Sequence, residues 1–222
     1  MIPPQQNADF VACMEDVLEL YQRSYDPQHP VVCMDERPVQ WVKETRWPLP
    51  PRPGGLRRYD YEYERAGTAS VFLFTEALRG WRQVSVRARR AAVDWAEELR
   101  DLLTRRYAKA EKVTLVCDNL NTHKVASFYE AFAPAEARRL AESLEIHYTP
   151  RHGSWLNIAE CELSVLGRHC LAQRTGSVAA LRGKVTPWTE NRNRRQRGVD
   201  WQFTTADARI KLKRLYPYVQ MS

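Results

Sequence analysis

Three acidic residues in the sequence have the types and positions needed for metal chemistry. Two short apolar runs, 31–34 and 113–117, are each followed by an aspartate, Asp35 and Asp118, and a third carboxylate, Glu160, follows the segment WLNIA. Carboxylates at the ends of strands project into the crevice where open α/β sheets bind ligands. About three carboxylates suffice to hold two divalent ions about 4 Å apart during phosphoryl transfer. The pattern therefore indicates a metal-dependent phosphodiester enzyme.

For two of the three carboxylates, periodicity does not decide which of two neighbouring acidic residues is the metal ligand. The two-residue period of a strand places Asp35 on one face of its strand and Glu36 on the other, so either carboxylate could be the ligand. Glu160 falls in a predicted helix that Ser154 can cap, and it has no lysine or arginine at helical spacing. Glu162, two residues further on, is its rival.

The histidines and cysteines do not favour zinc. His123 and His147 have no companion at metal-ligand spacing, which favours structural roles for both. The five cysteines are odd in number and form no Cys-x-x-Cys pair, so we expect reduced thiols.

Composition is that of an ordinary globular protein. The chain has 222 residues, 44% of them hydrophobic, which allows burial of roughly 70% of the unfolded surface. No apolar stretch approaches the about 20 residues of a membrane helix, and the first residues lack the pattern of a signal peptide. We expect a cytoplasmic protein.

Positive charge is concentrated in the last quarter of the chain. The net charge is +7, and residues 168–222 hold 12 Lys/Arg against 3 Asp/Glu, whereas the preceding residues hold 22 against 24. Such a surplus is typical of a face that binds a polyanion such as DNA, but also of a solvated basic helix surface. Charge alone leaves both readings open.

The order of predicted elements is β-β-β-α-β-α-β-α. A helix over 8–22 precedes these elements, and a loop over 44–58 contains four prolines and two glycines. Turns are predicted at Ala66-Gly67 and at Arg79-Gly80. The other expected elements are a strand at 31–35, a β-meander through 59–64, 70–74 and 81–87, strands at 113–118 and 145–148, and helices at 92–103, 123–132, 135–143, 178–193 and 206–215. The pattern predicts an α/β protein with a ribonuclease H-like fold, a mixed five-stranded sheet flanked by helices, and a helical C-terminal extension.

Three segments together resemble a known family. They are VVCMDE at 31–36, DNLNTH at 118–123 and YTPRHGSWLNIAE at 148–160. This combination closely resembles the catalytic domain of the DDE transposases of the bacterial insertion-sequence 630 family, in the mariner superfamily. The resemblance spans roughly residues 8–216 and includes YDYEYER at 59–65 and DARIKL at 207–212.

The resemblance implies a catalytic triad. It carries over Asp35, Asp118 and Glu160 as the residues that bind two Mg²⁺ or Mn²⁺ ions, and it favours Glu160 over Glu162 because Glu160 follows Trp-Leu-Asn in the family pattern. It further implies hydrolysis at transposon ends, then attack of the exposed 3′-hydroxyl on target DNA, typically at a TA dinucleotide. Both steps are in-line phosphoryl transfers.

The resemblance also implies supporting residues, partners and a division of the chain. Residues that would support the triad or contact DNA are Asn119, His123, Arg151, His152 and Trp155. The loop 44–58 corresponds to a segment that reaches a partner subunit, so we expect a homodimer on paired DNA ends. We expect a connecting helix in 1–26, the catalytic domain in 27–172 and a basic helical extension of that domain in 173–222. The expected location is the bacterial cytoplasm, at the nucleoid.

One departure from the family pattern leaves rival functions open. Family members usually carry helix-turn-helix modules before the catalytic domain, and this sequence begins a few residues ahead of the connecting helix. A truncation, a separate reading frame or a decayed copy would each explain this. The rivals are a ribonuclease H-like nuclease without strand transfer, and a catalytically silent remnant that binds DNA or inhibits a full-length transposase.

Overall fold

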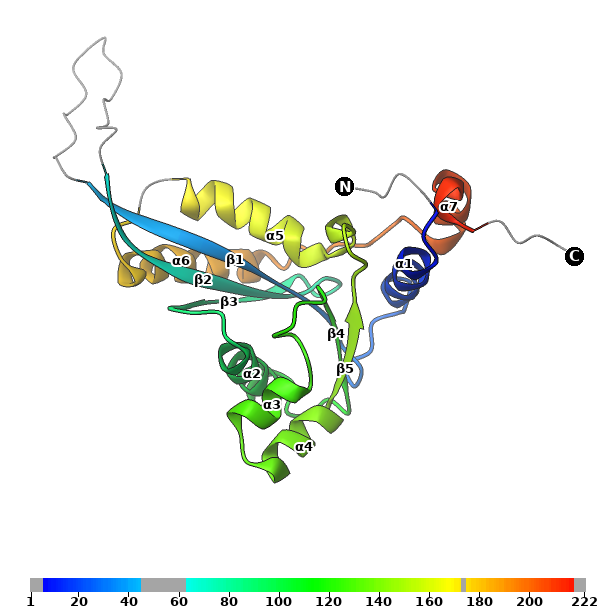
Figure 1. The fold of residues 1–222 in the computed structure, drawn as a ribbon, viewed down its shortest axis with the longest axis horizontal. Coiled ribbons are helices and arrows are strands. Elements are labelled where there is room, and N and C mark those ends of the chain that lie inside the picture. The colour runs from blue at the N-terminus through cyan, green and yellow to red at the C-terminus, as the bar shows by residue number, and fades with distance from the viewer. Residues whose placement is uncertain (1–5, 45–62, 173–174, 218–222) are drawn as a thin grey trace, which may run out of the picture.

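The computed structural model describes residues 6–44, 63–172 and 175–217 (Figure 1). Side chains are described for all of these except 41–44 and 63–66. The predicted loop 44–58 therefore lies outside the described residues, apart from Glu44 at its start, and so do most of the residues of the predicted strand 59–64.

Five strands form one mixed sheet in the order β3-β2-β1-β4-β5. The antiparallel pairs β1/β2 and β2/β3 make up one side, and the parallel pairs β1/β4 and β4/β5 make up the other. The strands are β1 Val31–Glu44, β2 Tyr63–Glu76, β3 Trp81–Arg87, β4 Val113–Cys117 and β5 Leu144–Tyr148. This is the mixed five-stranded sheet that the sequence predicts.

Helices cover both faces of the sheet (Figure 1). They are α1 Ala8–Tyr21, α2 Ala92–Asp101, α3 Ala126–Ala131, α4 Pro134–Glu142, α5 Ile158–Leu166, α6 Val178–Arg195 and α7 Thr205–Lys211. Short π-helical turns follow α2 (Leu102–Arg106) and α5 (Gly167–Leu171), and 3-10 turns span Ser154–Leu156 and Lys213–Leu215. Within the described part of the chain, no helix has both the length and the apolar character needed to cross a membrane.

The two faces of the sheet have separate apolar cores, because strand residues alternate in direction. Val32 and Met34 of β1 belong to the core under α2, α3 and α4. Cys33 of β1 belongs to the other core, which α1, α5, α6 and α7 complete. Leu181 of α6 and Ala208 of α7 are fully buried in that second core, so the C-terminal segments share the core that covers one face of the sheet.

The predicted turn at Ala66-Gly67 is wrong. Strand β2 runs through both residues without a break, and β1 pairs with it as far as Glu44. Gly67 has φ 141° and lies opposite Trp41, where the register of the two strands shifts. Glycine adopts positive φ easily in a bulge as well as in a turn, which is why the same residue suggests either structure.

Most other sequence predictions agree with the structure. The turn at Arg79-Gly80 is confirmed, with Gly80 at φ 64°, and strand β3 begins and ends where the sequence predicts. Helix α6 continues through Pro187 to Arg195, two residues past its predicted end, whereas α3 is shorter than predicted.

Candidate active site

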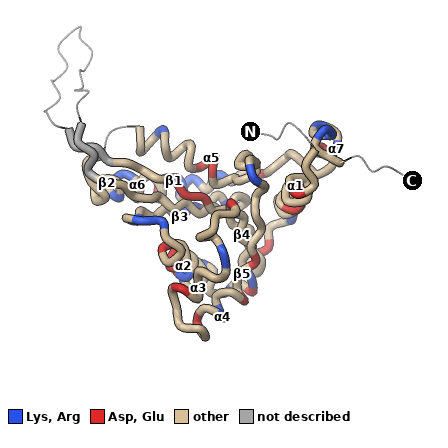
Figure 2. The backbone as a smooth tube through the Cα atoms, viewed as in Figure 1, with Lys and Arg blue, Asp and Glu red and all other residues tan. Residues whose placement is uncertain are grey.

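The carboxylates gather where β1 and β4 separate. Parallel pairing of these strands covers only residues 31–33 of β1; β1 then continues along β2, whereas β4 ends at Cys117. Asp35 lies within β1, two residues beyond Cys33, the last residue that pairs with β4, and Asp118 directly follows β4. Both line one cavity of about 730 Å³, together with Glu160 from the first turn of α5. The structure thus brings the three predicted residues to a single site, and Figure 2 shows acidic positions on the neighbouring β1 and α5.

Asn157 attaches the start of α5 to β1. Its Oδ1 accepts a hydrogen bond from the backbone N–H of Ala159 at 3.1 Å, so Asn157 caps the helix, and its Nδ2 donates to the carbonyl of Met34 at 2.9 Å. The predicted cap, Ser154, instead begins the preceding 3-10 turn. Because Met34 immediately precedes Asp35, this buried amide sets the position of Glu160 relative to Asp35.

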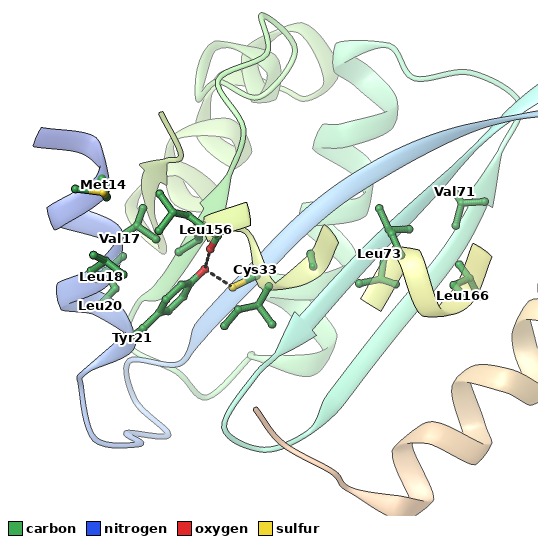
Figure 3. Close-up of a cluster of buried hydrophobic side chains, with 14 of the residues drawn as sticks. Met14, Val17, Leu18, Leu20, Tyr21, Cys33, Val71, Leu73, Leu156 and Leu166 are labelled. Carbon is green, nitrogen blue, oxygen red and sulfur yellow. Dashed lines mark hydrogen bonds between the residues drawn. The ribbon is translucent and has the colours of Figure 1, made fainter. Parts of the chain in front are cut away.

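Tyr21 of α1 also links strand β1 to the turn before α5 (Figure 3). Its buried hydroxyl donates to the carbonyl of Leu156 at 2.7 Å and lies 3.3 Å from Sγ of Cys33. Helix α1, strand β1 and the turn before α5 therefore meet at one hydroxyl group, two residues before Asp35.

Asp35 is held in an environment that disfavours its negative charge. Burial raises its pKa to about 7, and the nearby carboxylates of Asp118, Glu160 and Glu36 add to this effect, although the N–H of Glu36 donates to Oδ1 at 2.7 Å and lowers it. Among the described residues no lysine or arginine forms an ion pair with Asp35. A bound cation would relieve the repulsion among these carboxylates.

Glu36 points to the opposite face of the sheet. Its side chain is 4% exposed, and its carboxylate lies 3.1 Å from Nη1 of Arg90 and 3.8 Å from Nε2 of His123. The alternation that left Asp35 and Glu36 open in the sequence thus places only Asp35 in the cavity.

Glu162 is similarly engaged elsewhere. Its buried carboxylate accepts hydrogen bonds from Nη2 of Arg82 at 2.8 Å and from Nη2 of Arg192 at 2.7 Å. Burial by itself would raise its pKa, but the two guanidinium groups hold the pKa below its usual value. Glu160, by contrast, is exposed and faces the cavity. Neither arginine is near Glu162 in sequence, so no local pattern signals this pairing.

His123 is buried directly behind Asp118. Its Nδ1 lies 2.6 Å from Oδ1 of Asp118, and its ring stacks on Trp95 with centroids 5.6 Å apart. Although burial lowers its pKa, the hydrogen bond with Asp118 and the nearby Cys117 and Glu36 side chains raise the pKa of His123 to about 11. The contact of its Nδ1 thereby orients the carboxylate of Asp118.

The second histidine considered for zinc, His147, also bonds to carboxylates. Its Nδ1 lies 2.7 Å from Oδ2 of Asp16, and its Nε2 lies 3.4 Å from Oε1 of Glu145. Over the described ranges of the chain, no three His, Cys, Asp or Glu side chains are already arranged to hold a metal ion. The three carboxylates therefore share a cavity without converging on one point.

The other predicted site residues divide into two groups. Asn119, Arg151 and His152 line the cavity with the triad. Trp155 lies outside the cavity lining and packs against the C-terminal segment, with its ring centroid 6.5 Å from that of Trp201 and 5.9 Å from that of Phe203. Sequence reasoning missed the part of the wall formed by the first turns of α1, which consists of Asn7, Asp9, Phe10 and Cys13.

Comparison with known proteins identifies the family. Residues 30–182, more than half of the chain, match the model of the DDE superfamily endonucleases, so the chain belongs to this family. No curated protein sequence matches it.

Solved structures of the mariner transposase Mos1 share the fold. A pre-cleavage Mos1 transpososome matches with a TM-score of 0.62, 17% identity, and coverage of 99% of this chain and 66% of that chain. The Mos1 paired end complex with Mn matches with a TM-score of 0.59 and 16% identity, and the match covers 98% of this chain and 66% of that chain. The Mos1 strand transfer complex matches with a TM-score of 0.57 and 18% identity, and the match covers 86% of this chain and 56% of that chain. The fold is therefore ribonuclease H-like, and the chain spans between 56% and 66% of the length of these three transposase chains.

Proposed function

We propose that the protein is the catalytic domain of an insertion-sequence transposase of the 630 family, which cleaves DNA at insertion-sequence ends and joins the cut end to target DNA. The observation that carries this proposal is the meeting of Asp35, Asp118 and Glu160 from three different elements in one cavity of a DDE superfamily endonuclease. The likeness to Mos1 complexes with paired ends and after strand transfer supports it.

The three carboxylates would hold two Mg²⁺ or Mn²⁺ ions. Carboxylate oxygens are the donors that these hard cations prefer. Burial and the neighbouring carboxylates raise the pKa of Asp35, and a bound cation would oppose that effect. Ions bound there would activate the attacking oxygen and stabilise the leaving oxygen. Solved Mos1 complexes contain Mn or Mg, which agrees with this assignment.

The protein's own groups would position that chemistry. Asn157 holds the start of α5 against β1, and His123 orients Asp118 through its Nδ1. Asn119, Arg151 and His152 would contact DNA at the rim of the cavity. The surplus of 12 Lys/Arg over 3 Asp/Glu in residues 168–222 would supply sequence-independent affinity for phosphates.

The division of the chain and its assembly belong to the same proposal. Residues 1–26 would connect to the catalytic domain at 27–172, and 173–222 would form an extension that shares the domain's core. The segment 44–58 would reach a second subunit in a dimer on paired ends. The target would be a TA dinucleotide, and the setting the bacterial nucleoid.

Two reactions test the proposal. Wild-type protein is incubated with Mn²⁺ and supercoiled plasmid to measure nicking, and with a labelled pre-cut end plus plasmid to measure joining. The matched variants are Asp118→Asn, which removes one charge from the cavity, and Asp101→Asn, which removes one from helix α2. We expect Asp101→Asn to retain both activities and Asp118→Asn to lose both.

Other outcomes identify the rival functions. Triad-dependent nicking without joining would indicate a nuclease that does not transfer strands. DNA binding with no nicking, even at high protein concentration, would indicate a silent remnant. Nicking that survives in Asp118→Asn would refute the assignment of the site.

A further inference from the structure

Arg37 follows Asp35 on the same face of strand β1. Side chains of a strand alternate between faces, so Cys33, Asp35, Arg37 and Val39 point the same way. Cys33 and Val39 pack in the core that α5 covers, which fixes the direction of the two residues between them. Arg37 therefore faces the α5 side of the sheet, one step along the strand from Asp35.

The guanidinium of Arg37 lies against Gly167 at the end of α5. A Cβ atom added to Gly167 would be only 2.5 Å from Nη1 of Arg37, so the absence of a side chain leaves the room that the guanidinium occupies. Gly167 follows Glu160 by seven residues, which is about two helical turns, so both lie on nearly the same side of the helix. Asp35 and Arg37 on the strand thus run alongside Glu160 and Gly167 on the helix.

Arg37 is exposed and has no carboxylate partner among the residues that the structure describes. Arg82, Arg90 and Arg192, in contrast, each pair with a glutamate near the site. The donors of Arg37 are therefore available to a ligand from solvent.

We propose that Arg37 binds a phosphate of the DNA strand that enters the cavity, adjacent to the phosphodiester that is cut. This inference rests on the proposed function. The planar guanidinium matches two phosphate oxygens at once, and it is the side chain best suited to such contacts. Two residues of an extended strand span about 7 Å, a reach comparable to the separation of successive phosphates in a nucleic acid strand. A phosphate bound by Arg37 would place the next one near Asp35.

The alternative is a structural role, in which Arg37 stabilises the C-terminal end of α5 through its positive charge. The two roles differ in what they predict for DNA. If Arg37 is structural, its replacement lowers the stability of the fold and leaves the salt dependence of DNA binding unchanged. If Arg37 contacts a phosphate, its replacement changes the salt dependence of DNA binding and leaves the stability unchanged.

Three variants and a control separate these roles. Arg37→Ala removes the charge, Arg37→Lys retains it without the bidentate geometry, and Gly167→Ala retains it but displaces the guanidinium. Arg105→Ala removes an arginine whose side chain is 79% exposed and which lies in the turn after α2. Thermal unfolding of all four shows whether each variant is folded.

The first measurement is DNA affinity without divalent ions, over a range of salt concentrations. For Arg37→Ala we expect affinity to fall roughly tenfold or more, as for loss of a charged hydrogen bond. The slope of log affinity against log salt should become shallower by about 0.9, the value for one duplex phosphate. Arg37→Lys should keep the wild-type slope, and Arg105→Ala should match wild type. An unchanged slope in Arg37→Ala would overturn the proposal.

The second measurement uses duplexes in which one phosphate near a mapped cleavage position is replaced by an uncharged methylphosphonate. Wild type should cleave more slowly when a phosphate next to the cut bond is neutralised. Arg37→Ala already lacks the contact to that phosphate, so neutralising it should not slow cleavage by this variant any further. Gly167→Ala should show an intermediate sensitivity. Equal sensitivity of wild type and Arg37→Ala at every position would overturn the proposal. If wild type does not cleave at all, the proposed function fails, and the metal-free binding measurement still decides the role of Arg37.

Discussion

Replacing Glu162 by glutamine should destabilise the protein without removing a residue of the cavity. Glu162 is 5% exposed and joins three elements, because its partners Arg82 and Arg192 come from β3 and α6. Arg82 is itself 2% exposed. The substitution would leave a buried guanidinium opposite a neutral amide.

The size of the effect follows from this burial. Removing one partner of a buried ion pair costs about 3–5 kcal/mol, and glutamine keeps one oxygen that can accept a hydrogen bond, so we expect the lower end, about 3 kcal/mol. For a chain of this length each kcal/mol lowers the melting temperature by about 2–4 °C, which gives a decrease of about 6–12 °C.

Thermal unfolding followed by circular dichroism provides the assay, with Glu160→Gln as the matched control. Glu160 is two residues away on the same helix, exposed, and one of the carboxylates that repel Asp35. We expect Glu160→Gln to melt at or slightly above the wild-type temperature and to lose nicking activity. Melting of Glu162→Gln within about 2 °C of wild type would refute the reasoning.

Further predictions concern the supports of the site and the pH dependence of stability. Asn157→Ala should cost about 2 kcal/mol, because it removes the cap of α5 and the bond to Met34, and should slow nicking roughly tenfold or more; wild-type activity would contradict its positioning role. Gly80→Ala should cost about 1–3 kcal/mol in urea unfolding, since Gly80 has φ 64° and a Cβ there would lie 2.6 Å from backbone atoms of residues 196 and 197. Arg209 holds the pKa of Glu15 below its usual value, so this pair stabilises the fold above the unfolded pKa and the contribution is lost as pH falls. Arg209→Ala should therefore narrow the difference in unfolding free energy between neutral and acidic pH, only slightly because Arg209 is exposed; an unchanged difference would contradict this.

The sequence locates β3, β4, β5, the start of β1 and the acidic candidates, because alternation and helical spacing are local properties, but it misses the extent of β1 and the continuity of β2 through Ala66 and Gly67. It could not decide between Asp35 and Glu36, since both faces of β1 are buried and either direction is compatible with the apolar pattern. The choice is set by Arg90 and His123, which approach Glu36 from distant parts of the chain.

On helix α5, too, partners that are distant in sequence decide which carboxylate faces the cavity. Helical spacing searches only neighbours one turn away, whereas the arginine partners of Glu162 lie 80 and 30 residues distant in sequence. The resemblance to a family, and not periodicity, favoured Glu160. Residues that hold the site together, such as Tyr21, carry no chemical signal in the sequence, because their bonds go to the backbone or to a buried thiol.

The central claim is that Asp35, Asp118 and Glu160 together hold divalent metal ions, and direct binding of Mn²⁺ tests it most closely. Electron paramagnetic resonance of free Mn²⁺, titrated with protein and a short DNA duplex, gives the number of bound ions and their affinity. We expect two ions per wild-type chain and a large loss of affinity in Asp118→Asn and Glu160→Gln, with no loss in Asp101→Asn. Equal Mn²⁺ binding by wild type and Asp118→Asn would contradict the assignment of the site.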